Sequence, residues 1–108
     1  MRFTPVLTCL SIGAVMSAAP AFAEGDPVQG EIKVETCIGC HGVEGYSNVY
    51  PSYKVPKLAG QHAAQIVAAL QAYKSGERVH PTMSAQAGSL SDQDIEDIAA
   101  YLASLKNN

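Results

Sequence analysis

Two cysteines and a histidine fall within five consecutive residues of this chain, Cys37-Ile38-Gly39-Cys40-His41. Residues three and four apart lie on one face of a helix, so both thiols and the imidazole can face one bound group. The C-x-x-C-H motif is typical of c-type haem attachment, in which both cysteines form thioether bonds and the histidine binds iron. The alternatives are a disulfide, a thioredoxin-like redox pair and a zinc site. The redox pair requires a β-α-β pattern, which the sequence lacks.

A haem iron bound by His41 has a sixth position, which decides between an electron carrier and an enzyme or sensor. A protein ligand there restricts the iron to passing electrons, whereas an open iron can bind a gas or turn over peroxide. Met83 is the only methionine after the first 23 residues, and we expect it to be this ligand. His80 is the competing ligand. We interpret His62, at the start of a predicted helix, as a solvated or capping residue.

The N-terminal segment has the features of a secretory signal. An arginine precedes an apolar run over residues 6–19, and residues 21–23 (Ala-Phe-Ala) form a small-x-small cleavage site. We expect residues 1–23 to be removed after Ala23, which leaves residues 24–108 as one domain in the bacterial periplasm. The apolar run is shorter than the roughly 20 residues of a membrane span, so we expect no stable membrane anchor.

The composition of the predicted mature chain indicates a core that needs a bound group. Residues 24–108 contain neither Phe nor Trp, and hold six basic against ten acidic side chains. Their Ile, Leu and Val content is near the lower limit of about 20% for a chain that folds unaided. A flat apolar haem would complete such a core. The acidic balance does not favour nucleic-acid binding.

The sequence predicts an all-α domain of three main helices and two long loops. Capping signals at Asp26-Pro27 and at Ser91 begin the first and last helices, and the last has the strongest apolar stripe. Long loops in a small domain are usually functional, and Met83 lies in the second. The predicted helices cover residues 26–41, 61–75 and 91–105, and the loops cover residues 42–60 and 77–90.

Further segments give the chain a family resemblance. From about Pro27 to Lys106 it resembles the class I c-type cytochromes, especially the small c-553 type and one half of the dihaem c4 type. The dihaem relatives carry two such domains, whereas this chain has one C-x-x-C-H motif, so pairing of haems would require two chains. The resemblance rests on residues 37–42 (CIGCHG), 56–61 (PKLAGQ), 73–78 (YKSGER), and Met83 followed by 90–95 (LSDQDI).

The resemblance implies a small class I cytochrome c fold, in which three main helices and long loops surround one covalently attached haem c. It also implies a crossing of the first and last helices at Gly30 and Tyr101. The implied site residues are Cys37 and Cys40 as thioether anchors, His41 and Met83 as axial iron ligands, and Pro56, whose carbonyl accepts a hydrogen bond from the ligand histidine.

The implied function is one-electron transfer without a bound substrate, so the chain would be a soluble carrier, monomeric or weakly dimeric, and not an enzyme. Its partners would be redox donors and acceptors such as cytochrome complexes or terminal oxidases and reductases. The alternatives are an electron-entry subunit of a larger complex, or a haem sensor or peroxidase if Met83 does not bind iron.

Two features of the predicted loops bear on docking and on the haem propionates. Residues 42–90 carry a net charge of +2, while the flanking segments 24–41 and 91–108 together carry −6. We hypothesise that the middle segment forms a mildly basic docking rim. The alternative is a scatter of solvated charges. The candidates for hydrogen bonds to the propionates are Tyr46, Tyr50, Tyr53 and Arg78.

Overall fold

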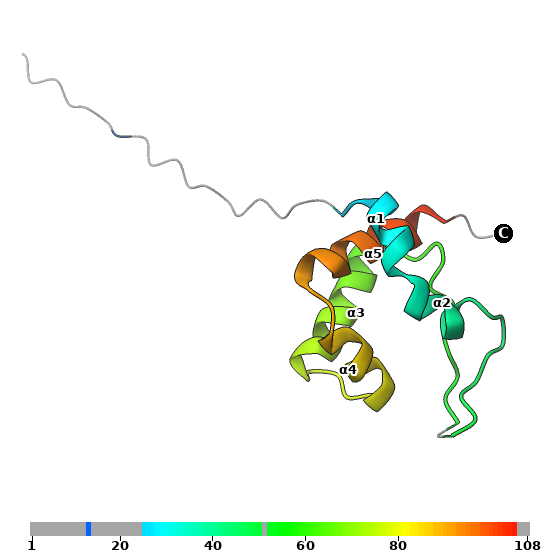
Figure 1. The fold of residues 1–108 in the computed structure, drawn as a ribbon. Helices are drawn as coiled ribbons and strands as arrows, with labels where there is room; N and C mark the ends of the chain where they lie inside the picture. The colour runs from blue at the N-terminus through cyan, green and yellow to red at the C-terminus, as the bar shows by residue number, and fades with distance from the viewer. Residues whose placement is uncertain (1–12, 14–24, 51, 106–108) are drawn as a thin grey trace, which may run out of the picture.

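The computed structural model describes residues 25–50 and 52–105, together with Gly13. The predicted signal and its cleavage site lie outside these described ranges, apart from Gly13. The described chain is all-α, as predicted, and its β-structure is a single bridge between Ser47 and Lys54. No helix within the described ranges is long and apolar enough to cross a membrane. The helices are α1 (Pro27–Lys33), α2 (Glu35–His41), α3 (Ala63–Ser75), α4 (Pro81–Gly88) and α5 (Asp92–Ser104) (Figure 1).

The first predicted helix is two helices that meet at Val34. The Asp26 carboxylate caps α1 by accepting from the backbone N–H of Val28 at 2.9 Å. The backbone of buried Val34 stays helical, and its carbonyl accepts from the N–H of Cys37, three residues on, at 2.8 Å as well as from that of Ile38 at 3.1 Å. This tighter turn separates α1 from α2, so the C-x-x-C-H segment has a short helix of its own.

The prediction that residues 77–90 form a loop is wrong for Pro81–Gly88, which is helix α4. Its start follows the usual rules, because His80 caps the helix with its side chain and Pro81 occupies the first turn. Only Ala87 of α4 is buried, so the segment has no apolar periodicity to reveal it. Met83 therefore lies in the first turn of a helix and not in a loop.

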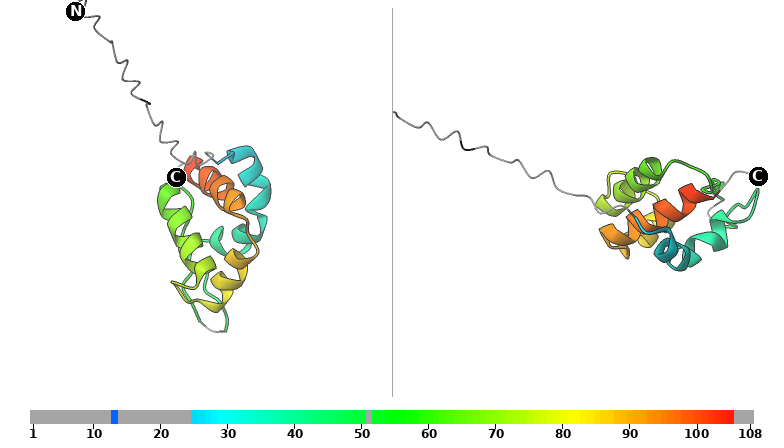
Figure 2. Two further views of the ribbon diagram at one scale, coloured as in Figure 1. Left: turned by 90° about the vertical axis from the view of Figure 1, so that its left-hand side faces the viewer. Right: turned by 90° about the horizontal axis from the view of Figure 1, so that it is seen from above.

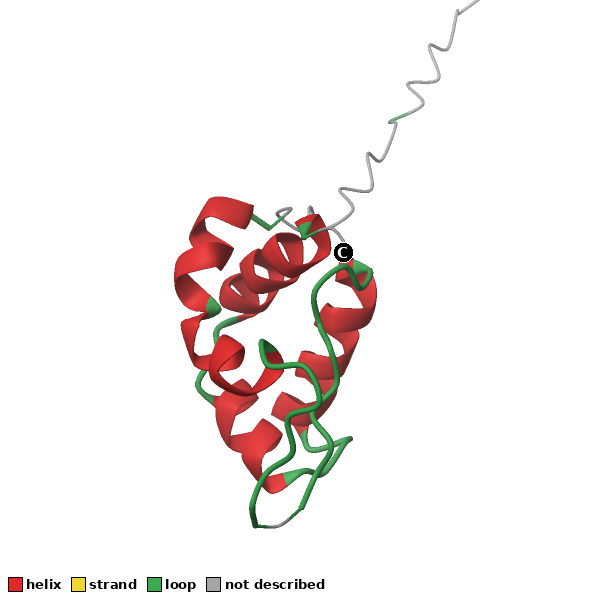
Figure 3. Ribbon diagram, turned by 90° about the vertical axis from the view of Figure 1, so that its right-hand side faces the viewer, coloured by secondary structure: helices red, strands yellow, loops and turns green. Residues whose placement is uncertain are grey.

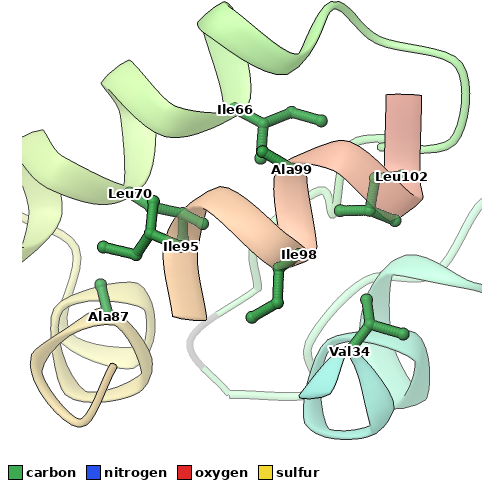
Figure 4. Packing of buried hydrophobic residues seen from close by; sticks show 8 residues of the cluster. All are labelled: Val34, Ile66, Leu70, Ala87, Ile95, Ile98, Ala99 and Leu102. Carbon is green, nitrogen blue, oxygen red and sulfur yellow. The ribbon is translucent and has the colours of Figure 1, made fainter. Parts of the chain in front are cut away.

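Helix α5 is the centre of the core. It lies between α1 and α3 in Figure 2 and packs against both. The stripe predicted for it consists of Ile95, Ile98, Ala99, Leu102 and Leu105, and it is confirmed at the first four, which are buried (Figure 4), whereas Leu105 is half-buried. The capping signal predicted at Ser91 is a capping box formed by Ser91 and Asp94. Among the described residues, the other buried apolar side chains are Val34, Ile66, Leu70 and Ala87.

The crossing of α1 and α5 is close because α1 presents a buried glycine there. A Cβ added to Gly30 would overlap the backbone carbonyl of Asp97 and lie 2.7 Å from the Cβ of Tyr101. The crossing implied by the resemblance at Gly30 and Tyr101 is thus present. A side chain at position 30 would push the two helices apart.

A charged cluster beside this crossing ties α1 to α5. Lys33 Nζ lies 2.6 Å from Asp97 Oδ2 and 2.9 Å from Asp94 Oδ1. Asp97, whose side chain is 3% exposed, also accepts from the backbone N–H of Asp26 and the amide of Gln93, each at 2.8 Å. The hydrogen bonds from Lys33 lower the pKa of both carboxyls, that of Asp94 to about 2. The buried carboxylate is therefore fully partnered.

Candidate haem site

Helix α2 brings the three residues of the C-x-x-C-H motif to one cavity. Cys37, Cys40 and His41 all line a cavity of about 760 Å³, a size within the roughly 300–1,000 Å³ of cofactor sites. Ile38 and Gly39, on the other side of the turn, are exposed. The two cysteines are free and not joined in a disulfide. Burial raises the pKa of the Cys37 thiol.

The imidazole of His41 is held by a residue far along the chain. Its Nδ1 lies 2.7 Å from the carbonyl oxygen of Pro56, a residue between α2 and α3. The loops are green in Figure 3. A carbonyl can only accept, so Nδ1 carries a proton, and in the neutral ring the lone pair is then on Nε2. A histidine that binds a metal usually donates its other N–H to such an acceptor, which fixes the tautomer and the ring orientation. The geometry of His41 therefore suits a metal ligand.

Met83 lines the same cavity and belongs to α4, an element separate from α2 (Figure 1). Its side chain is half-buried and packs against the core. The structure thus brings together Cys37, Cys40, His41, Pro56 and Met83, the five residues that the sequence proposes for the site.

The remaining lining of the cavity is mostly apolar. Helix α3 contributes Ile66, Ala69 and Leu70, and α5 contributes Ile98 and Leu102. These side chains belong to the core or border it, so the cavity opens directly onto the packed interior. Such a lining suits a flat apolar ring. Within the described ranges, no group of three or more His, Cys, Asp or Glu side chains could hold a metal ion, so the zinc alternative has no ligand set among them.

An aromatic cluster, whose packing the sequence does not predict, lies at one side of the cavity. The rings of Tyr53 and His80 have centroids 4.1 Å apart, and Tyr73 meets His80 edge-on at 6.4 Å. The guanidinium of Arg78 lies 4.7 Å from the centre of the Tyr73 ring. These four residues line the cavity. The capping signal of His80 followed by proline was the clue that could have located part of this cluster.

The other polar candidates are less uniformly placed. Of the four residues proposed for the propionates, Tyr53 and Arg78 line the cavity, whereas Tyr50 is 94% exposed. His62 is exposed and begins α3 without a side-chain capping bond. His80, the competing ligand, accepts from the backbone N–H of Met83 through Nδ1 at 3.3 Å.

Comparisons with known proteins agree with this geometry. The sequence profile of the family "Cytochrome c" matches residues 30–106. Cytochrome c-554(548) of Halomonas halodenitrificans is 42% identical over 83 residues, which cover 74% of this chain and 96% of that protein. Cytochrome c4 of Pseudomonas aeruginosa is 42% identical over 86 residues, which cover 80% of this chain but 41% of that protein. The chain thus matches less than half of that c4.

A solved structure gives the same picture in three dimensions. The cytochrome c4 structure from Acidithiobacillus ferrooxidans superposes with a TM-score of 0.63 at 26% identity. The superposition covers 79% of this chain and 53% of the other. The fold described above is thus similar to about half of a c4 structure.

Proposed function

The chain belongs to the cytochrome c family, and from that premise we propose that it carries single electrons in the bacterial periplasm through a haem bound by His41 and Met83. Family membership makes it an electron carrier with one covalently attached haem c and not an enzyme. The axial ligands, the compartment and the partners are the parts that we propose.

The residues of the cavity fit this group. The free thiols of Cys37 and Cys40 would hold the haem covalently, which prevents its loss from a small diffusing protein. His41, oriented by the carbonyl of Pro56, would bind the iron through Nε2. Met83 would close the sixth position with a thioether, a ligand that raises the reduction potential of a haem. When bound, the haem supplies the one-electron Fe(III)/Fe(II) couple.

One observation carries the proposal. Side chains from α2, from the loop at Pro56 and from α4 converge on a single cavity of suitable size. A solitary methionine is more often a filler of core gaps. Met83, however, lines the same cavity as His41 and both cysteines, so its position supports a role as the second ligand.

The proposed partners follow from the chemistry of a carrier. They are redox donors and acceptors, such as cytochrome complexes or terminal oxidases and reductases, which the chain would meet as a monomer or weak homodimer. Lys54 and Arg78 line the cavity, which supports the mildly basic docking rim that we propose there. Lys74, in contrast, pairs with Asp92 at 3.3 Å.

A potentiometric titration of the protein produced in a bacterium with c-type haem maturation tests the proposal. We expect a single one-electron transition at a positive potential, and a lower midpoint for Met83→Ala. His62→Ala is the matched control and should leave the midpoint unchanged. A Met83→Ala midpoint equal to that of the wild type would rule out Met83 as the ligand.

The compartment requires a separate measurement. Cell fractionation followed by mass spectrometry should find the chain in the periplasm, beginning at Glu24 and carrying one haem. Cytoplasmic protein that retains residues 1–23 with its haem attached would contradict this part of the proposal.

A further inference from the structure

The strength of the attachment of α4 decides how firmly Met83 is held. This helix is eight residues long and buries only Ala87. Among the helices that the structure describes, it packs against α3 alone. A helix this short is marginal without tertiary support, and segments with few buried apolar contacts open most readily. The contacts that hold its first turn therefore matter.

His80 supplies those contacts from the cap position of α4. Its Nδ1 accepts from the backbone N–H of Met83 at 3.3 Å. Its own backbone N–H lies 3.4 Å from the hydroxyl oxygen of Ser84, which accepts from it. Met83 is the third residue of α4, the position whose N–H a capping side chain usually satisfies. The cap thus acts directly on the proposed ligand residue.

The ring of His80 is fixed in turn by two other elements. Tyr53, from the loop between α2 and α3, packs on it with centroids 4.1 Å apart, and Tyr73 of α3 meets it edge-on. An aromatic cap is larger than the usual Ser, Asp or Asn, so it can both bond the helix end and pack against neighbours. His80 therefore joins the start of α4 to α3 and to the long loop.

We propose that His80 is a positioning residue which, through its capping bond to the N–H of Met83, holds that side chain at the haem iron. The proposal rests on the proposed function, because it requires Met83 to be the ligand. Loss of the cap would raise the population in which α4 is open and the sixth position is free. The loss of a cap corresponds to a change of about 2- to 30-fold in that population.

Imidazole added to the ferric holoprotein at pH 7 measures this population, because it binds where Met83 has left. Its apparent Kd falls in proportion as the open population rises. We expect His80→Ala and His80→Phe to bind imidazole about 2- to 30-fold more tightly than the wild type. His80→Asn keeps a capping acceptor and should stay within about 2-fold. His62→Ala, which changes a helix start without a capping bond, should have no effect.

The outcomes distinguish the capping bond of His80 from its packing on Tyr53, and both of these from the binding of iron by Met83. Unchanged imidazole binding in His80→Ala and His80→Phe would overturn the proposal. The proposal would also be overturned if His80→Phe bound imidazole like the wild type while His80→Asn bound it more tightly. The packing on Tyr53, and not the capping bond, would then be the positioning contact. If His80→Ala fails to mature, the Asn and Phe variants carry the same test. A different result would refute the proposed function instead. In that case the wild-type ferric protein would lack the red-region band of a methionine-bound haem, and Met83→Ala would leave the spectrum unchanged.

Discussion

Gly30→Ala tests the helix crossing that supports the haem cavity. In an isolated helix this substitution stabilises by about 1 kcal/mol, because Ala loses less backbone entropy than Gly. Here the new Cβ would overlap the backbone carbonyl of Asp97 and approach the Cβ of Tyr101 to 2.7 Å. Backbone cannot rotate away as a side-chain tip can, so α1 and α5 must separate. Overpacking of this kind destabilises a protein by about 1–3 kcal/mol. Because the overlap here is with backbone, we expect a cost at the upper end of this range.

The net expectation is a loss of about 2 kcal/mol in the free energy of unfolding. For a domain of this size that loss lowers the melting temperature by about 8–16 °C. Urea unfolding of the ferric holoprotein, followed by far-UV circular dichroism, measures the difference. Gly88→Ala is the matched control, because an added Cβ there meets nothing within 4 Å, and it should stabilise by up to about 1 kcal/mol. A Gly30→Ala protein as stable as the wild type would refute the close-crossing argument.

Three further predictions concern charge, attachment and docking. The pKa of Asp94 is lowered in the fold to about 2 and that of Asp97 is also lowered, chiefly by the hydrogen bonds from Lys33. The stabilisation from both carboxylates is therefore present above the pKa of an unfolded Asp, about 4, and is lost as the pH falls through the lowered pKa values. In urea unfolding, Lys33→Met should flatten this loss of stability with falling pH, and an unchanged slope would contradict the prediction. Cys40→Ala should retain its haem through the one thioether to Cys37, and its visible spectrum after denaturation should differ from that of the wild type. Complete loss of haem would refute the idea that Cys37 attaches the haem without Cys40. The rate of electron transfer to an acidic partner should fall as ionic strength rises, and it should fall less steeply in Lys54→Ala. A wild-type rate that does not change with ionic strength would exclude electrostatic steering.

The sequence predicts most reliably where local pattern and tertiary packing agree. The stripe on α5 is complete enough for Ile95, Ile98 and Leu102 to be recognised as core, and all three are buried. Helix α4 could not be found this way, because its support comes from a cap and from contacts with α3. The break at Val34 was also hidden, because Gly30, Val34 and Cys37 keep the spacing of a single helix face across it. Short helices held by caps leave little periodic signal.

At the site, the C-x-x-C-H motif indicates a haem but does not indicate which side chains surround it. The residues Cys37, Cys40 and His41 follow from their spacing, Met83 follows from being the only methionine after residue 23, and Pro56 follows from the resemblance. The packing of Tyr53 on His80 joins segments 27 residues apart, and nothing local in the sequence specifies it. Likewise, the acidic start of the last helix predicts a cap, but not that Asp97 would be buried with Lys33 and the backbone of Asp26 as partners. Such contacts exist only once the chain has folded.

The central claim is that His41 and Met83 are the two axial ligands of the iron in one covalently attached haem. The visible absorption spectrum of the purified protein, recorded in the ferric and ferrous states, tests it most directly. We predict a low-spin haem that stays on the chain after denaturation, with a red-region band in the ferric state that Met83→Ala removes. A high-spin ferric spectrum without that band, together with ready binding of carbon monoxide by the ferrous protein, would contradict it.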